Sequence, residues 1–329
     1  MKNIIAFTIM ILGLMVSSLT YEVNAQVEMT TPEAWTEDTL LSDKEFESID
    51  TTYTLKQDEK NNNWYLYGRT LDYLNAKDKS VLVLHQRWDQ KDSSWYNQER
   101  TVRDYNRYGK ESRSLYQEWN KNFEDWIHVK MKTISYDGRN KSEVLYQEWM
   151  KPAGEWINSM LYLLEYNHKG EKSNIMIRTY SPSTDSWTNS QRYTFEYKEG
   201  YGYPDVVYLE KWKPSSKTWD RQGRYLLDHN MRGKKTFESR ATWNEIRNEW
   251  VNSIRYMMEY QKDNITKEIE QRYNYKTKEW INANRFLYQY NKEGELELET
   301  RQKWDSATNG WQTTGKFKYT DVKNLIPKA

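Results

Sequence analysis

The sequence contains no cysteine among its 329 residues. This excludes disulfides, thiolate metal sites and cysteine nucleophiles. Charge of one sign is also lacking, because 49 Lys and Arg face 48 Asp and Glu. Such a chain has no long-range attraction to nucleic acid or to an anionic membrane. Leu, Ile, Val and Phe make up only about a sixth of the chain, which raises the question of disorder. The 16 Trp and 27 Tyr indicate a folded chain, since disordered chains are poor in aromatic residues.

Long apolar runs are confined to the N-terminus. Lys2 and the apolar stretch of residues 4–16 precede Val23-Asn24-Ala25, which is the pattern of a signal peptide cleaved between Ala25 and Gln26. A short membrane anchor is the weaker alternative, because the run is below the ~20 residues that span a bilayer. We therefore expect an exported protein, periplasmic or secreted to the cell surface, with no membrane span in the mature chain. Residues 1–25 are the signal peptide, 26–49 an acidic leader and 50–329 one repeat domain.

Tryptophan recurs with a period of about 31 residues, and this repetition dominates the sequence. The first series is Trp64, Trp95, Trp126, Trp156, Trp187, Trp219, Trp250, Trp280 and Trp311. A second large ring stands seven residues before each member except the first, at Trp88, Trp119, Trp149, Tyr180, Trp212, Trp243, Tyr273 and Trp304. Turn-forming residues separate the two rings and return about fourteen residues after the second, at Gly109, Asn140, Gly170, Gly233, Asn264 and Gly294. Turn signals at this spacing predict strands joined by hairpins.

The predicted fold is all-β: an extended antiparallel meander, like a solenoid, of about nine 31-residue hairpin repeats. A two-layer wrap of the sheet is the alternative. Strict alternation along a strand places Trp250, Ile254, Tyr256, Met258 and Tyr260 on one face, an aromatic ladder on the inner side of a coiled sheet. The opposite face then carries an arginine row, Arg69, Arg100, Arg192, Arg224, Arg255 and Arg285, with acids such as Asp104 and Glu259. We expect cross-strand ion pairs there. The recurring Asn97, Asn158, Asn189, Asn252 and Asn282 are expected to bond the backbone or one another.

The segment Leu145-Tyr146-Gln147-Glu148-Trp149, followed by Glu155-Trp156-Ile157-Asn158-Ser159 and Gly170, resembles a known group of proteins. These are secreted Bacteroidota proteins built from Trp- and Tyr-rich hairpin repeats, distantly similar to YD-repeat (Rhs-like) proteins. The resemblance covers about residues 50–320. It implies an exported β-rich repeat protein with no established activity.

Catalytic signals are weak throughout. The four histidines, His85, His128, His168 and His229, occupy different repeat positions, so we expect no metal site, and the sequence contains no phosphate-binding glycine loop or nucleophile motif. We predict no catalytic residues and no cofactor.

We therefore expect a non-enzymatic structural or binding module of the cell envelope or exterior. A glycan-binding protein is the first alternative and a polysaccharide hydrolase the less favoured one; the partner would be a glycan or another envelope protein. Trp95, Trp126, Trp156, Trp187, Trp219, Trp250 and Trp280 are expected to be structural. Trp64, Trp304 and Trp311, near the ends of the array, are the candidates for ligand stacking.

Overall fold

The structure of the protein, a computed structural model, describes residues 46–58, 63–198 and 202–320. The predicted cleavage site at Ala25 and Gln26 lies outside them, as do the signal peptide and most of the leader. In the described part every regular element is a strand, and none of it forms a helix with the length and apolar character of a membrane span. The strands are β1 (Ser48–Gln57), β2 (Trp64–Leu74), β3 (Ser80–Asp89), β4 (Ser94–Tyr105), β5 (Glu111–Asn120), β6 (Asp125–Asp137), β7 (Asn140–Met150), β8 (Glu155–Tyr166), β9 (Lys172–Ser181), β10 (Ser186–Tyr197), β11 (Pro204–Lys213), β12 (Thr218–His229), β13 (Lys235–Asn244), β14 (Glu249–Gln261), β15 (Asn264–Asn274), β16 (Glu279–Tyr290), β17 (Leu296–Asp305) and β18 (Gly310–Thr320).

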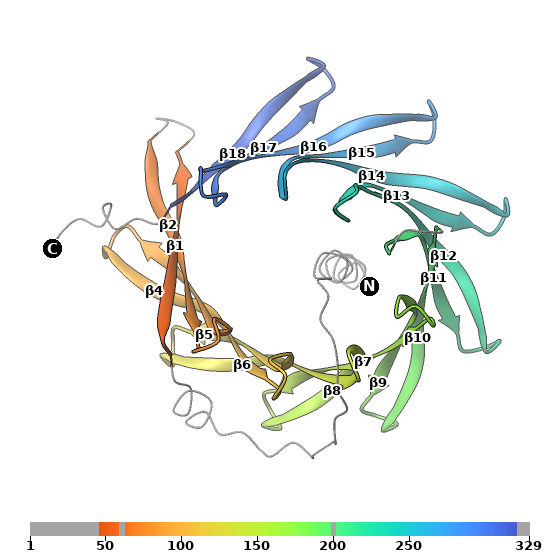
Figure 1. Ribbon diagram of the computed structural model, residues 1–329, viewed down its shortest axis with the longest axis horizontal. Helices are drawn as coiled ribbons and strands as arrows, with labels where there is room; N and C mark the ends of the chain where they lie inside the picture. The colour runs from red at the N-terminus through yellow and green to blue at the C-terminus, as the bar shows by residue number, and fades with distance from the viewer. Residues whose placement is uncertain (1–45, 59–62, 199–201, 321–329) are drawn as a thin grey trace.

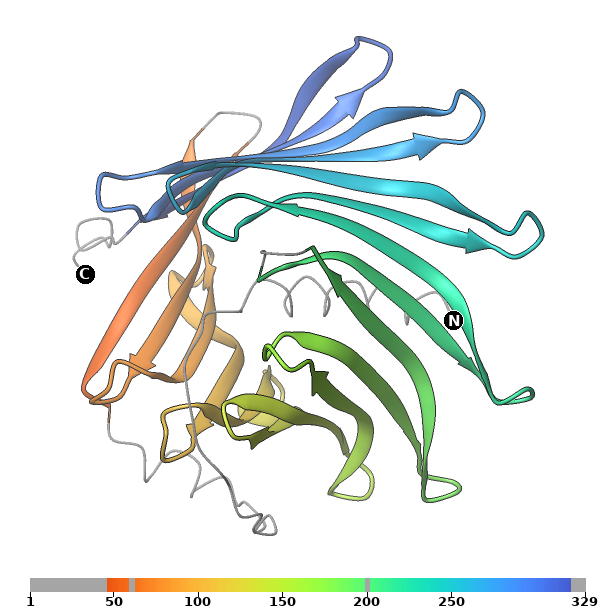
Figure 2. The ribbon, with the colours of Figure 1, turned by 45° about the vertical axis from the view of Figure 1, so that its right-hand side comes forward.

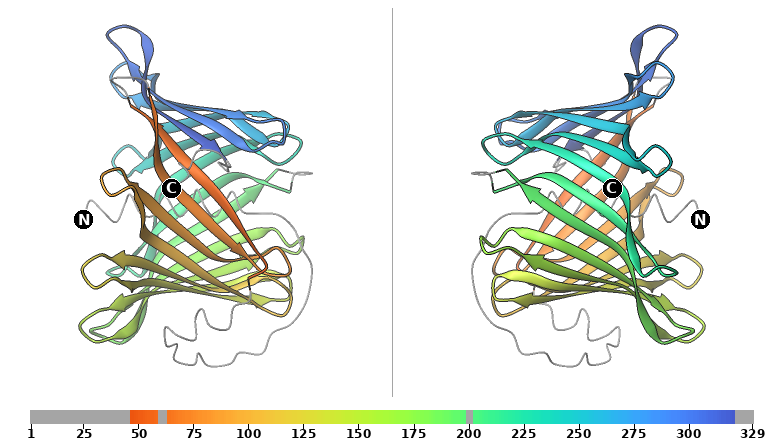
Figure 3. Two further views of the ribbon diagram at one scale, coloured as in Figure 1. Left: turned by 90° about the vertical axis from the view of Figure 1, so that its left-hand side faces the viewer. Right: turned by 90° about the vertical axis from the view of Figure 1, so that its right-hand side faces the viewer.

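The 18 strands form one antiparallel sheet that closes into a barrel (Figure 1). Each strand pairs with its neighbours in sequence, and β1 pairs with β18 through Tyr53 to Lys56 and Phe317 to Thr320. Figures 2 and 3 show the strands inclined to the barrel axis, as closure of a sheet requires. The expectation of hairpin repeats is confirmed, whereas the expectation of an open, solenoid-like array is wrong. Closure gives every strand two partners and leaves the array without free ends.

A β-bulge recurs in every even-numbered strand, three residues after its tryptophan. In β14, for example, Arg240 of β13 faces Ile254 and Ala241 faces Asn252, so that Ser253 is the extra residue. The corresponding extra residues are Tyr67, Gln98, Val129, Ser159, Ser190, Gln222, Ser253, Ala283 and Thr314. A bulge bends its strand and increases the local twist. Nine bulges at one level supply the curvature that a closed sheet needs.

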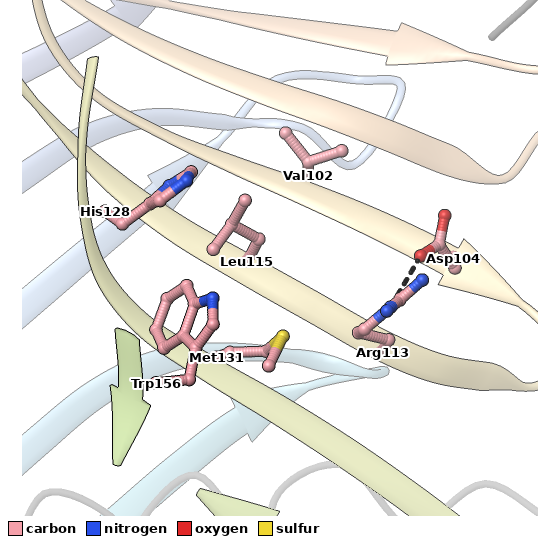
Figure 4. A pocket seen from close by; sticks show the side chains of 7 residues that line it. All are labelled: Val102, Asp104, Arg113, Leu115, His128, Met131 and Trp156. Carbon is pink, nitrogen blue, oxygen red and sulfur yellow. Dashed lines mark hydrogen bonds and ion pairs between the residues drawn. The ribbon is translucent and has the colours of Figure 1, made fainter. Parts of the chain in front are cut away.

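The bulge also reverses the predicted faces. Because one residue is inserted, Trp250 and Asn252 share a face with Arg255 and Met257, while Ile254 and Tyr256 point to the other side. Figure 4 shows the tryptophan face from outside the barrel: Trp156 and its neighbours lie in front of their strands, and strands of the opposite wall lie behind. The aromatic ladder expected on one inner face is therefore two sets of rings. The tryptophans lie on the outer face with the arginines, and tyrosines such as Tyr162 and Tyr256 lie on the inner face.

Two kinds of turn connect the strands, one kind at each end of the barrel. Four-residue turns follow the odd strands from β3 to β17, and their last residue has positive φ, as at Ser93 and Asn248. Turns of the Asn-x-x-Gly type follow several even strands. At Asn106 the side-chain oxygen accepts the backbone N–H groups of Tyr108 and Lys110, and Gly109 takes φ of 70°, which glycine adopts without strain. The turn residues predicted at Gly109, Gly170, Gly233 and Gly294 are confirmed in this role.

Apolar side chains form a cluster on each face. The inner cluster extends over β6 to β12 and contains Ile134, Tyr162, Ile175, Tyr193 and Val207. The outer cluster is smaller, with Leu82, Val102 and Leu115 buried and Met131 and Trp156 packed against them. The barrel wall is thus stabilised from both sides.

Because the barrel is closed, a pair of engineered cysteines should be able to link the first and last strands. Thr54 and Tyr319 face each other across β1 and β18, and the chain has no native cysteine. We expect Thr54→Cys combined with Tyr319→Cys to form a disulfide on mild oxidation, because paired strands bring Cα atoms within the roughly 4.4–6.8 Å that a disulfide spans. Non-reducing peptide mapping measures it. Thr54→Cys with Tyr288→Cys is the control and should remain reduced; equal behaviour of the two pairs would contradict closure.

Candidate functional site

Each arginine of the outer row stacks on the tryptophan of the next repeat. The distance from guanidinium carbon to ring centroid is 4.6 Å for Arg69 and Trp95, 4.4 Å for Arg100 and Trp126, 4.9 Å for Arg192 and Trp219, 5.3 Å for Arg224 and Trp250, 4.6 Å for Arg255 and Trp280, and 4.6 Å for Arg285 and Trp311. These are cation–π distances. The arginines that alternation placed on a separate face are thus the covers of the tryptophan rings.

A side-chain relay holds four of these arginines in place, Arg69, Arg100, Arg255 and Arg285. Arg255 Nε donates to Gln271 Oε1 at 2.6 Å, and Gln271 Nε2 donates to Asn282 Oδ1 at 2.7 Å. Arg69, Gln86 and Asn97 repeat the arrangement with the same distances. Only Arg192, in the outer row, bonds an acid at this place, Glu210. The arginines of the outer row thus bond mostly amides, whereas Asp104 and Glu259 form the expected cross-strand ion pairs, with Arg113 and Lys267. Asn97, Asn158 and Asn282 bond glutamine side chains instead of the backbone or one another.

The tryptophan pairs at the odd-to-even hairpins pack edge to face. Trp304 and Trp311 have ring centroids 5.1 Å apart at 70°, and Trp243 and Trp250 have 5.0 Å at 66°, a favourable geometry for two rings. Trp311 therefore has the same neighbours as an interior ring. Trp64 faces Gln57 instead of a second ring and is 37% exposed. Ligand stacking at Trp64, Trp304 and Trp311 stays a prediction.

The repeat changes at β6, where Met131 occupies the place of the arginine and His128 the place of the asparagine. The rest of the relay is retained beyond Met131, since Gln147 Nε2 donates to Asn158 Oδ1 at 3.1 Å. β8 carries Leu161 at the arginine place. At β6 the change coincides with a pocket on the outer face (Figure 4).

Four strands build the pocket. Its lining side chains are Val102 and Asp104 of β4, Arg113 and Leu115 of β5, His128 and Met131 of β6, and Trp156 of β8. Figure 4 shows Leu115 and Met131 in the middle, with the Asp104–Arg113 pair at one end and His128 and Trp156 at the other. The site therefore combines an apolar floor with polar groups at two separate ends.

The buried relay below the pocket fixes the tautomer of His128. Arg100 Nε donates to Gln117 Oε1 at 2.7 Å, and Gln117 Nε2 lies 2.9 Å from His128 Nδ1. Arg100 is 6% exposed and Gln117 is 0% exposed. Because arginine has only donors, the amide oxygen must face Arg100 and the amide N–H must face the imidazole. Nδ1 is then the acceptor, and Nε2 carries the proton of a neutral ring.

Electrostatics agree with a neutral imidazole. Burial lowers the pKa of His128, and the nearby Arg100 lowers it further, with Asp125 opposing. The ring also packs against Trp149 and Trp156, at centroid distances of 4.9 and 5.4 Å. At the other end, Arg113 Nε donates to Asp104 Oδ2 at 3.2 Å, and burial lowers the pKa of Arg113. The pocket thus presents a donor at His128 and a matched ion pair at Asp104–Arg113.

The inner face carries a second group of charged side chains, on β13 to β17. Glu238 pairs with Lys235 and Arg240, Glu270 Oε1 lies 2.9 Å from Arg272 Nε, and Glu299 Oε1 lies 2.5 Å from Arg301 Nε. The three glutamates are nearly buried. Since each has a cation beside it, this row is an internal ion-pair network of the barrel wall.

Sequence reasoning found the repeat but missed this pocket. His128 was considered only as one of four scattered histidines, and among the described residues no three potential metal ligands come together. Met131 belongs to no catalytic or ligand-binding motif of the sequence. Its signal is present in the sequence, because six of the nine tryptophans of the first series have an arginine five residues later, whereas Trp126 has Met131. That row becomes meaningful only once the arginines are known to cover the rings.

Closure changes the expected effect of ring deletion. We expect Trp250→Ala and Trp311→Ala each to lower the free energy of unfolding by about 2–4 kcal/mol, somewhat below a full core deletion because the rings are half-buried. Trp64→Ala, which removes an unpaired ring, should cost under about 1 kcal/mol. Urea denaturation measures all three. A negligible effect at Trp250 and Trp311 would contradict a structural role for the paired rings.

The buried relay predicts a pH-dependent stability. Because the folded-state pKa of His128 is lowered, the unfolded chain binds more protons just below its ordinary pKa, and stability falls as pH falls from about 7 to 5. His128→Asn, which introduces the residue of five other repeats, should reduce this slope, whereas His168→Asn in an exposed turn should leave it unchanged. Urea titrations at several pH values measure the slope. An unchanged slope in His128→Asn would refute the buried, neutral imidazole.

The sequence matches no family model and no curated protein. Solved structures give low similarities. A protein of unknown function from Bacteroides fragilis has 15% identity over 38% of this chain and 89% of its own, with a TM-score of 0.33. A porin-like protein from Bacteroides uniformis has 9% identity over 84% of this chain and 98% of its own, with a TM-score of 0.38. A DUF3836 family protein from Bacteroides vulgatus has 17% identity over 29% and 91%, with a TM-score of 0.26. Similarity this low carries no argument about function.

Proposed function

We propose that this protein is an exported, non-enzymatic binding module of the cell envelope or exterior, and that it binds its ligand in the outer pocket around His128, Met131 and Trp156. The observation that carries the proposal is the local departure from the repeat. Arginine covers the tryptophan in six other units. At Trp156 the shorter, uncharged Met131 stands in its place and lines a pocket.

The pocket has the composition of a ligand site. Small-molecule sites are concave and mainly apolar, with a few placed polar groups. Val102, Leu115, Met131 and Trp156 supply the apolar part, and methionine adapts its shape to a ligand more readily than branched side chains do. A purely structural repeat would be better stabilised by arginine at residue 131, because Gln147 and Asn158 already hold the rest of the relay.

Catalysis has less support than binding. The carboxylate that lines the pocket, Asp104, is paired with Arg113, whereas glycoside hydrolysis ordinarily uses two carboxyl groups across the scissile bond. His128 accepts from Gln117 through Nδ1, so it cannot take a proton there without breaking the relay. A hydrolase therefore remains the alternative that an activity assay on polysaccharides addresses.

A row of exposed rings that binds a linear glycan also has less support. In six of the ring pairs an arginine occupies one face of the tryptophan, and the partner ring occupies an edge, as at Trp311. Trp64 is the most accessible of the three candidates, but it stands alone. The pocket offers one site instead of a row.

A methyl-labelled NMR screen tests the proposal. With ¹³C-methyl methionine in the full mature chain, a library of soluble aromatic acids, amines, sugars and nucleosides should contain at least one class that shifts the Met131 methyl signal saturably. Met176, on the same face at β9, is the internal control and should not move. Absence of any Met131 response at millimolar concentrations would contradict binding at this site.

A further inference from the structure

We infer that the outer pocket binds a single neutral pyranose, whose apolar face lies on Trp156 and Met131 and whose hydroxyl groups bond the Asp104–Arg113 pair and His128. This inference rests on the proposed function, because it names the ligand class of the same pocket. It differs from a glycan platform of exposed rings, since one ring and one pocket are involved.

The apolar floor selects a ligand with one flat apolar face. Leu115 and Val102 are buried at 4% and 2% exposure, and Met131 and Trp156 pack against them. Elsewhere in the barrel the same level of the sheet is covered by a planar guanidinium. A pyranose presents axial C–H groups on one face, and such a face can occupy the position of that planar cover and bury apolar area. The floor alone would equally accept an aromatic ring, so the polar ends decide.

The Asp104–Arg113 pair favours hydroxyl groups over charged groups. Its two members lie 3.2 Å apart and are partly buried. A ligand carboxylate would compete with Asp104 for the guanidinium, and a ligand ammonium would compete with Arg113 for the carboxylate; either leaves a partly buried charge unpaired, which is costly. A hydroxyl group both donates and accepts. It can therefore donate to Asp104 and accept from Arg113 while the pair stays together.

The fixed tautomer of His128 sets the requirement at the other end. With Nδ1 engaged by Gln117, the ring has one remaining hydrogen-bonding atom, Nε2–H, which is a donor. It needs an oxygen acceptor, and a sugar ring oxygen or hydroxyl provides one. A ligand with an apolar face, a hydroxyl edge and no net charge satisfies the floor and both ends at once.

One substitution can close the pocket without disturbing the fold. Met131→Arg introduces the residue that six other repeats carry at this place, and its Nε would meet Gln147 Oε1 as Arg100 meets Gln117. The guanidinium would then cover Trp156 as Arg100 covers Trp126. We expect unchanged or higher thermal stability and loss of the ligand position. Arg255→Met, the reverse exchange on β14, four repeats away from the site, is the matched control and should leave binding intact.

Saturation-transfer NMR with the methyl glycosides of glucose, galactose, mannose and N-acetylglucosamine, on the full mature chain, tests the inference. We expect saturation at the C–H groups of one sugar face for at least one glycoside, a shift of the Met131 methyl signal, and binding at least about tenfold weaker in Met131→Arg. The Met131 signal locates the sugar even if that variant fails to fold.

Three outcomes would overturn the inference. If none of the glycosides binds but another library class shifts Met131, the ligand class is wrong and the binding function stands. If no compound of any class shifts Met131, both fail. If a glycoside binds equally to wild type and Met131→Arg, or binds without a Met131 shift, the sugar site lies elsewhere on the molecule.

Discussion

The single extra residue in each even strand is the constraint on which the whole molecule depends. It stands three residues after the tryptophan in all nine even strands, so its bends add around the sheet at one level. A meander of this width would otherwise twist open or split. With the bulges it curves until β1 meets β18. The same residue decides which side chains share a face, and it therefore brings arginine and tryptophan together.

The arginine–tryptophan contact packs the side chains of neighbouring repeats against one another. The guanidinium stacks on the ring of the next repeat and bonds the glutamine between them, and that amide bonds the following even strand. Three strands are thereby joined by side chains in addition to the backbone ladder. At β6 the contact is replaced by Met131, and the pocket arises where the covering cation is lacking, not from an added loop or domain.

Much of the architecture could be predicted from the sequence, and the remainder could not for identifiable reasons. The tryptophan spacing and the turn residues located the hairpins, because these signals are local. The prediction that Tyr256 shares a face with Trp250 was wrong, because alternation along a strand holds only while no residue is inserted. The inserted residue, Ser253, cannot be told from an ordinary small strand residue in the sequence. Closure was missed because β1 and β18 are about 260 residues apart in sequence and carry no motif for each other. Met131 and His128 could be recognised only against the relay that they interrupt.

Closure also limits how such a chain can change in length. In an open array a unit can be added or lost at an end, and the remaining units keep their contacts. In this barrel each described strand already has two hydrogen-bonded neighbours, and antiparallel order around a ring requires an even number of strands. Only a whole hairpin of about 31 residues can therefore be inserted or removed, and each such event alters the circumference while it preserves every local contact. The number of strands in barrels of this kind can consequently change only in steps of two. Each added hairpin brings with it the side chains that cover its tryptophan.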